Sequence, residues 1–492
     1  MKKMNLLAMS LVSAAALSFS SCSSNDDLTG GGTQSQADGV YMTLKISGAT
    51  SHGTRTGVTD GKTTTVPGEV GESTITNGML YIYDGNTCVF SKVITPEMFE
   101  TAPTMTTPGK TKPIKVAVTG AIKTNKAYNV YFLANNTDII DPLAADAKFT
   151  STQGGTDYAE DKKFVMFNQN DGTNQANHST VTFTDEAKSA DKAVAATPIK
   201  LDRVVARIDK PTFKATTVTA AADTKTSINV ADVIESIDFK GYAVSNLNNT
   251  SYVKQNWTET KPSWTLNVLT SGTPKYFLNK DTYGTKYQPD GLGNFGNGKW
   301  KYAFENTTTN IDEATAVYFQ VKANLKETKK NSSDFKDDTF YRYDGRLYTS
   351  IKDIFADAER GAIVNPFNLL TVEQVLAQIK DASTGKLTTN KEELAKFREN
   401  YKIEVYSQGI MYYRWAISDE AYKPFIESET THTYSVLRNS IYRLNVTKIK
   451  EIGKDVPNGP EPNDPDKNPN YYMNVTVSIN PWVLNTKDIE LK

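Results

Sequence analysis

Alternating apolar and polar positions dominate the pattern of this chain. The clearest case is the run Val40-Tyr41-Met42-Thr43-Leu44-Lys45-Ile46-Ser47. Its even positions, Val40, Met42, Leu44 and Ile46, are apolar, and the residues between them are polar or Tyr. A period of two is typical of a strand with one buried face. We therefore predict a β-strand here that buries these four side chains.

Similar runs recur through the whole chain, and clusters of turn-forming residues such as Asp84-Gly85-Asn86 separate them. The chain contains 25 Tyr and 20 Phe, and Thr is abundant, a composition that favours strands. Short strands with frequent turns are typical of β-sandwiches. The predicted strands span residues 79–83, 88–94, 114–118, 128–134, 164–167, 181–183, 234–244, 264–268, 316–321, 402–405, 411–417, 442–449 and 473–480.

Two short helices interrupt this pattern in the second half. Thr371 stands three residues before Gln374, which is the spacing of a capping box, and predicts a helix over 371–381. Asn390 stands before Glu393 and predicts a helix over 390–400. Both helices are expected to pack against the strands rather than to carry chemistry. The fold class is therefore all-β, with a few short helices in the C-terminal domain.

The N-terminus is organised as a secretory signal. Two lysines follow Met1, a mostly apolar stretch runs from residue 4 to 19, and Ser20-Ser21 precedes Cys22. We predict that Cys22 receives a diacylglycerol and that the precursor is a lipoprotein held at the outer membrane surface. Residues 23–36 are polar and rich in Gly and Ser, which is typical of a flexible tether.

Composition and motifs argue against several other classes of function. The net charge is −1, so no basic surface for nucleic acid is expected. The chain has three His, and the segment Gly291-Leu292-Gly293-Asn294-Phe295-Gly296 lacks the strand and helix that a dinucleotide fingerprint needs. Cys22 and Cys88 are the two cysteines, and lipidation of the first leaves no intrachain disulfide. We expect no cofactor, no metal site and no enzymatic activity.

The segment 473–479 repeats the pattern of the first strand. Met473, Val475, Val477 and Ile479 are apolar at period two, and Trp482 and Leu484 come after them. Either segment could fill the same groove with the same face inward, because the buried side chains set the register. The alternative interpretation is that these are two ordinary strands of separate sandwiches.

Arg55 favours the first interpretation. It is the first arginine of the chain and lies in a Gly- and Thr-rich stretch that we predict to be a loop over 48–72. A trypsin-like or Arg-specific protease needs such an exposed, pliable segment. Cleavage between Arg55 and Thr56 would free the strand 40–47 from its domain. The alternative interpretation is that Arg55 is an ordinary solvated charge of this loop.

Departure of that strand would open a groove with four apolar sockets and unpaired backbone on both sides. A strand from another subunit could fill it and recover a gross ~6–12 kcal/mol from four side chains. This is recognition by strand addition. Because donor and groove lie at different places on the subunit, the contact runs head to tail and need not close.

The sequence resembles the fimbrillins, the subunits of type V pili of Gram-negative anaerobes. The resemblance rests on the segments 126–136, 164–166, 201–208, 411–417, 435–444 and 477–491. It implies two transthyretin-like β-sandwich domains, lipoprotein export, cleavage after an arginine in the N-terminal loop, and polymerisation through a C-terminal donor strand. Arg55 and the segment from Met473 onward match those positions. Its partners would be other copies of itself, related pilus subunits, the protease and, before cleavage, the outer membrane.

These interpretations divide the chain into five segments. Residues 1–21 are the signal peptide, 22–55 a propeptide with tether and first strand, 56–205 and 206–470 the two β-sandwich domains, and 471–492 the donor-strand segment. The function they favour is a shaft subunit of a pilus that supports adhesion and ends outside the cell. The alternatives are a pilus tip subunit or a monomeric surface lipoprotein that binds a glycan or host ligand.

Overall fold

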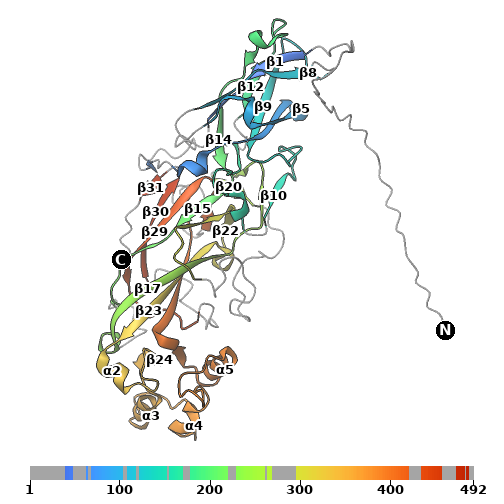
Figure 1. Cartoon of the computed structure of the whole chain (residues 1–492). Helices are drawn as coiled ribbons and strands as arrows, with labels where there is room; N and C mark the ends of the chain where they lie inside the picture. Colours follow the sequence, from blue (N-terminus) through green and yellow to red (C-terminus); the bar gives the residue numbers. More distant parts are fainter. Residues whose placement is uncertain are drawn as a thin grey trace, which may run out of the picture. The chain divides into compact units, whose positions relative to one another are not determined.

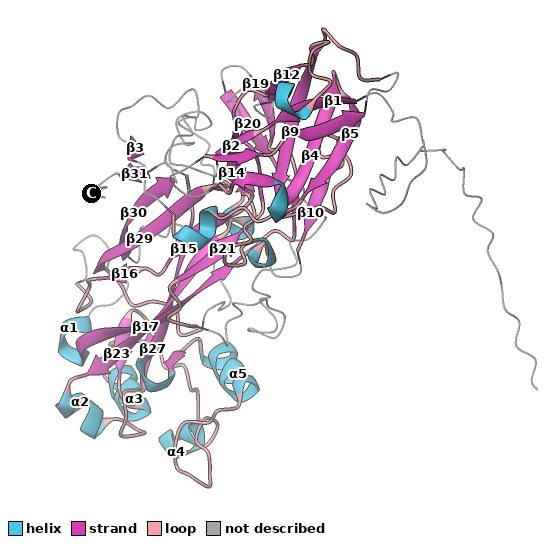
Figure 2. Cartoon of the chain, turned by 45° about the horizontal axis from the view of Figure 1, so that its top comes forward, coloured by secondary structure: helices cyan, strands magenta, loops and turns pink. Residues whose placement is uncertain are grey.

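The computed structural model describes most of the chain after residue 38. The described residues are 39–47, 63–64, 68–103, 108–117, 121–151, 154–169, 178–219, 229–260, 263–268, 295–419, 434–456, 473–481 and 484–486. Strands dominate both halves, so the predicted all-β class is confirmed. Figure 1 colours the chain along its sequence, and Figure 2 colours it by secondary structure, with helices in cyan and strands in magenta. Among the described residues, the α-helices all lie after residue 229, and the first half has 3-10 helices only.

The first half contains short strands joined by turns and 3-10 helices. Its strands are β1 Gly39–Thr43, β2 Lys45–Ser47, β3 Thr63–Thr64, β4 Gly78–Asp84, β5 Thr87–Ile94, β6 Phe99–Thr101, β7 Gly109–Thr111, β8 Ile114–Ala117, β9 Ala127–Ala134, β10 Lys148–Thr150, β11 Met166–Asn168, β12 Ser179–Thr182, β13 Val194–Ala195 and β14 Ile199–Arg203. Its 3-10 helices are η1 Val70–Ser73, η2 Pro96–Met98, η3 Thr156–Tyr158 and η4 Ala190–Lys192.

The second half has longer strands and a helical region. Its strands are β15 Ala206–Asp209, β16 Thr212–Phe213, β17 Ile234–Ser245, β18 Thr250–Tyr252, β19 Asn256–Thr260, β20 Ser263–Asn267, β21 Trp300–Ala303, β22 Asn306–Thr308, β23 Ala316–Leu325, β24 Phe340–Tyr343, β25 Arg346–Tyr348, β26 Glu404–Tyr406, β27 Ile410–Ala416, β28 Tyr434–Val436, β29 Ser440–Ile449, β30 Met473–Pro481 and β31 Leu484–Thr486. The helices are α1 Val230–Val233, α2 Glu327–Ser332, α3 Ile351–Glu359, α4 Val372–Leu376, α5 Lys391–Tyr401, η5 Ile311–Glu313 and η6 Ser407–Gly409.

Three sheets organise these strands. The first has the order β5-β4-β9-β11-β14-β2-β7-β6, and β12 joins it through β9. The second has the order β21-β15-β29-β30-β31-β3, and β16 joins it through β29. The third is β17-β23-β27, and a further three-stranded sheet, β25-β24-β26, and the pairs β10-β18, β19-β20 and β22-β28 complete the described strands. β1 lies outside these three and forms its own sheet with β8 and β13.

Buried apolar side chains form three main clusters. Along the chain the first runs from Val40 to Val205 and also takes in Val253, Tyr302 and Phe304 from the second half. The second begins at Ala206 and ends at Ile452. The third, from Phe335 to Val405, lies under helices α3, α4 and α5. Val253, Tyr302 and Phe304 therefore tie the second half of the chain to the first core, and the domain boundaries remain a prediction.

Both predicted helices are present, although α4 ends earlier than expected. The Thr371–Gln374 capping box forms and Asn390 caps α5, as predicted. Two details differ from the sequence expectation. The strand 40–47 is broken at Leu44, and the predicted loop 48–72 contains β3 and the beginning of η1.

Gly409 gives a test of the junction between β26 and β27. Its φ is +77°, and an added Cβ would lie 2.1 Å from the backbone oxygen of Ala323. Gly409→Ala should lower the free energy of unfolding by about 2–3 kcal/mol, because both the backbone conformation and the contact resist a side chain. Urea unfolding measures this. Gly298 has no atom within 4 Å of such a Cβ, so Gly298→Ala should stay within about 0.5 kcal/mol. Equal losses of stability in the two variants would contradict the role given to Gly409.

Candidate assembly site: the strand 39–47 and the C-terminal strands

The strand 39–47 has a backbone neighbour on each side. β1 pairs antiparallel with β8, where Val40 faces Val116, and parallel with β13, where Met42 faces Val194. β2 pairs antiparallel with β7 and parallel with β14. We call the space between these two pairs of flanking strands the slot. A strand in the slot satisfies its own backbone groups and those of four other strands.

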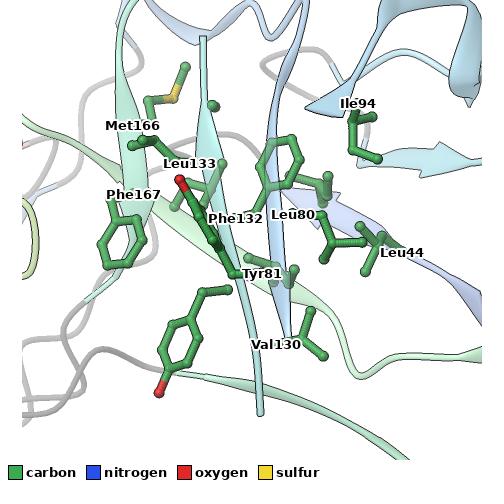
Figure 3. Packing of buried hydrophobic residues seen from close by; sticks show 14 of the residues in the cluster. Leu44, Leu80, Tyr81, Ile94, Val130, Phe132, Leu133, Met166 and Phe167 are labelled. Carbon is green, nitrogen blue, oxygen red and sulfur yellow. The ribbon is translucent and has the colours of Figure 1, made fainter. Parts of the chain in front are cut away.

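The four alternating side chains are buried, as their period predicts. Val40, Met42 and Ile46 are 0 % exposed and Leu44 is 1 % exposed. All four belong to the first core. Figure 3 shows Leu44 beside Leu80 and Ile94 of that core. Each of the four side chains occupies an apolar socket, and each socket would lose its packing if the strand left.

Thr111 holds the break between β1 and β2. The backbone N–H of Leu44 donates to Thr111 Oγ1 at 2.9 Å, and the backbone N–H of Thr111 donates to the Leu44 oxygen at 3.0 Å. Thr111 itself is buried. A side chain therefore supplies the hydrogen bond that the ladder lacks at this position. The sequence carried no signal for Thr111, because its role depends on a strand 67 residues away.

The C-terminal segment pairs with its own domain. β30 runs antiparallel to β29, from Met473 opposite Ile449 to Pro481 opposite Ser440. β31 then turns back along β30 and pairs on its other side with β3. Met473, Val475, Val477 and Ile479 thus alternate within β30, and Leu484 begins β31. The slot and β30 belong to different sheets of one chain.

Four of the predicted site residues lie outside the described residues. These are Cys22, Arg55, Thr56 and Trp482. Arg55 falls, along the sequence, between β2 and β3, so the predicted cut separates the strand in the slot from the rest of the chain.

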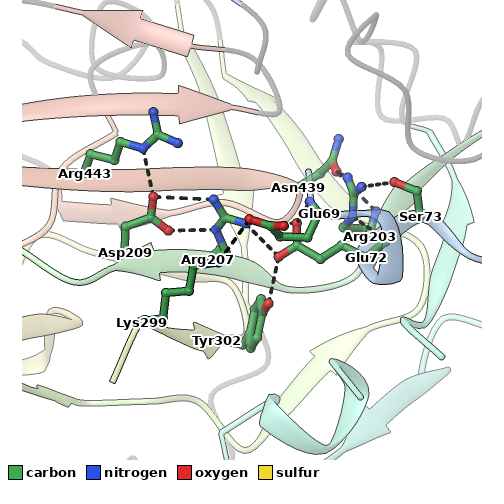
Figure 4. A network of polar contacts seen from close by, with 10 residues as sticks. All are labelled: Glu69, Glu72, Ser73, Arg203, Arg207, Asp209, Lys299, Tyr302, Asn439 and Arg443. Carbon is green, nitrogen blue, oxygen red and sulfur yellow. Dashed lines mark hydrogen bonds and ion pairs between the residues drawn. The ribbon is translucent and has the colours of Figure 1, made fainter. Parts of the chain in front are cut away.

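A buried polar network, drawn in Figure 4, lies between the two cores. The Glu72 carboxylate accepts two hydrogen bonds from Arg207, at 2.8 and 3.0 Å, and one from the Tyr302 hydroxyl at 2.7 Å. Arg207 also forms an ion pair with Asp209 at 2.7 Å. Burial and the neighbouring Glu72 carboxylate raise the pKa of Tyr302 well above its usual value, so its hydroxyl stays a donor.

Arg203 is the centre of a second group of contacts. It is fully buried and donates to the Glu72 backbone oxygen at 2.7 Å, to Ser73 Oγ at 2.6 Å and to Asn439 Oδ1 at 3.1 Å. Burial lowers the pKa of Arg203 to about 9, against the opposing effect of Glu72 and Asp202. The guanidinium is therefore charged at neutral pH.

This network joins the slot to the C-terminal strands. Arg203 ends β14, which flanks the slot, and Asn439 immediately precedes β29, which holds β30. Asn439 Nδ2 also donates to Asp202 Oδ1 at 2.7 Å. Sequence reasoning missed Glu72, which it placed in a loop, and gave Arg203 no role in the site. The one available signal was a charged residue inside an apolar run.

The C-terminal part of the chain is similar to a known protein family. Residues 404–488 match the model of the major fimbrial subunit protein type IV, fimbrillin, C-terminal region. This part of the chain is therefore similar to the C-terminal region of fimbrillins. The matched region begins at β26 and includes the β29–β30 pair and β31.

Solved structures of low sequence identity resemble this chain. A fimbrilin (FimA) from Porphyromonas gingivalis is 14 % identical, with 92 % of this chain and 99 % of that chain covered and a TM-score of 0.42. A candidate cell adhesion protein from Parabacteroides distasonis is 11 % identical, with 91 % of this chain and 100 % of that chain covered and a TM-score of 0.44. The tip fimbrial protein Mfa3 from P. gingivalis is 13 % identical, with 90 % of this chain and 100 % of that chain covered and a TM-score of 0.34. No curated protein matches the sequence.

Other kinds of site have little support in the part of the chain that the structure describes. It contains no group of three or more His, Cys, Asp or Glu placed to hold a metal ion, and no helix long and apolar enough to cross a membrane. Gly296, from the glycine-rich segment, forms a β-bridge with Tyr242. Cys88 packs against the first core, and burial raises the pKa of its thiol to about 11.

The Glu72 network predicts a large effect for a small substitution. Glu72→Gln keeps the size of the side chain but removes the charge that two buried partners contact. It should lower the free energy of unfolding by about 2–4 kcal/mol in urea. Glu100 pairs with Lys110 at the surface, where both side chains are more than half exposed, so Glu100→Gln should cost under about 1 kcal/mol. Similar values for the two variants would rule out a structural role for the network.

Proposed function

We propose that this protein is a structural subunit of a pilus shaft that supports adhesion. It is exported as a lipoprotein with its lipid on Cys22, cleaved after Arg55, and polymerised head to tail when a neighbour's C-terminal strand fills the slot. The observation that carries the proposal is the environment of the strand 39–47, which is buried on its apolar face and paired on both sides.

The slot explains why cleavage matters. While the chain is intact, the strand is covalently joined to its own domain and rebinds at a high effective concentration. A cut after Arg55 leaves a short segment that only backbone pairing and four side chains retain. The segment and any lipid on Cys22 can then leave together, and the emptied slot would expose edges that favour strand addition.

The C-terminal strands have the features of a donor. Met473, Val475, Val477 and Ile479 repeat the spacing of Val40, Met42, Leu44 and Ile46. In its own domain β30 has one long neighbour, β29, and only the short β31 on its other side. In a neighbour's slot it would have short strands on both sides, β8 and β7 on one and β13 and β14 on the other. The exchange therefore replaces one long ladder with four short ones.

The geometry of this exchange predicts an open chain of subunits. The slot lies in the first core, whereas β30 belongs to the sheet of the second. A subunit can therefore receive a strand and donate another at the same time. Such heterologous contacts form filaments when they do not close into a ring.

Cleavage can be tested with an arginine-specific protease. Wild-type protein cut after Arg55 should form ladders on a gel without heating, and Arg55→Gln protein should stay monomeric because its strand cannot leave. Lys62→Gln changes a second basic residue of the same segment and should keep the ladders. If cutting at Arg55 leaves the C-terminus intact and no ladder forms, the proposed function is wrong.

The donor strand can be tested by its alternation. Val477→Asp puts a carboxylate into an apolar socket, at a cost of several kcal/mol, and should abolish ladders. Ser478→Asp changes the opposite face of the same strand and should keep them. Urea unfolding before cleavage shows whether each variant is folded. Cut Val477→Asp protein keeps its slot, so adding it to wild-type protein should shorten the ladders. Ladders of equal length from both variants would contradict the donor assignment.

A further inference from the structure

An apolar recess of about 320 Å³ lies on the surface of the first half. Phe99 of β6 lines it together with Val70, Ile75, Pro96, Ala102 and Pro103. Val70 is 67 % exposed, which is unusual for a large apolar side chain. Exposed apolar side chains around a hollow are typical of a surface that binds a partner.

One side of the recess lies near the end of the strand that fills the slot. Pro103 packs on Gly109, since a Cβ there would lie 2.2 Å from its ring, and Gly109 pairs with Ile46 near the end of β2. On the other flank, β2 pairs with Ile199 and Lys200, whereas β14 continues to Arg203. Arg203 contacts Glu72 and Ser73 of η1, the element to which Val70 belongs. A strand that ran past residue 47 in the same direction would pass between Pro103 and η1, two of the elements that line the recess.

The two segments that match the slot continue into different kinds of sequence. Ile46 is succeeded by Ser47-Gly48-Ala49-Thr50, all small, and Ile479 by Asn480-Pro481-Trp482-Val483-Leu484. Four consecutive apolar residues do not fit the alternation of a half-buried strand. They fit a recess. Pro481 has no backbone N–H, so the ladder ends there and the chain can turn.

We infer that the recess binds the run Pro481–Leu484 of a neighbouring copy, with Trp482 as the main anchor. This inference rests on the proposed function and adds a direction and a driving force to it. The donor enters parallel to the strand that it replaces, with Met473 at the place of Val40 and Ile479 at the place of Ile46. The four sockets are then filled equally well before and after exchange. Trp482 supplies apolar contact that the propeptide lacks, because its large side chain buries more area than Ala or Thr.

Cross-linking tests the contact directly. Ala102→Cys and Trp482→Cys are made in separate full-length chains that also carry Cys88→Ser. The two proteins are mixed, cut with the arginine-specific protease and oxidised, and mass spectrometry identifies the disulfide-linked pair. Leu369→Cys serves as the control acceptor, because Leu369 is 98 % exposed and lies in the helical region. We expect at least ten times more linkage to residue 102 than to residue 369.

Ladder formation supplies the second measurement. Trp482→Ala should require about ten times more protein to reach the same polymer fraction, and Trp482→Phe should restore most of the loss. Ala102→Phe should fill the recess from the acceptor side and weaken assembly in the same way. If wild-type protein and these variants form ladders alike, or if residues 102 and 369 link equally, the recess is not the contact, although the proposed function stands. If cut wild-type protein forms no ladders, the proposed function and this inference both fail.

Discussion

The rest of the structure depends on the slot being filled. The strand 39–47 closes the gap between β7 and β8 on one side and β13 and β14 on the other, and its four apolar side chains complete the first core. An empty slot would leave two unpaired sheet edges and four open sockets, which a soluble protein tolerates poorly. Sheets, core and neighbouring recess are therefore arranged around a strand that the proposed cut makes replaceable. Any strand that fills the slot must supply both backbone pairing and apolar side chains.

The buried network determines how the two halves respond to that replacement. Glu72, Arg203 and Arg207 fix the end of β14 against the strands of the second half through Tyr302 and Asn439. Breaking one partner leaves an uncompensated buried charge, so the junction resists bending. The path from the slot to β30 consists of hydrogen-bonded elements: β14, the Arg203–Asn439 contact and β29. Under the proposed assembly, a load applied to a donor strand in the slot would pass through these elements of the receiving subunit.

The sequence predicted what local periodicity encodes. The strands, the capped helices and the burial of Val40, Met42, Leu44 and Ile46 follow from a period of two, from capping residues and from turn formers. It failed where a contact joins distant segments. Thr111 accepts a hydrogen bond from Leu44, and Glu72 meets Arg207, only because the fold brings them together. The strand β3 was missed for the same reason, since tertiary pairing rather than local propensity determines it.

The Thr111 hydroxyl has a consequence for slippage under tension. It accepts a hydrogen bond from whichever backbone N–H stands at the place of Leu44, so a proline is excluded from that position. In the parallel register that we propose for the donor strand, Val477 would stand there, and Pro481 would lie past the end of the slot. Pulling on the donor would draw Pro481 backward, first to the place of Ile46 and then opposite Thr111, where it has no N–H to donate. Pro481 would then resist further sliding of the donor strand, because it cannot donate the hydrogen bond that Thr111 accepts.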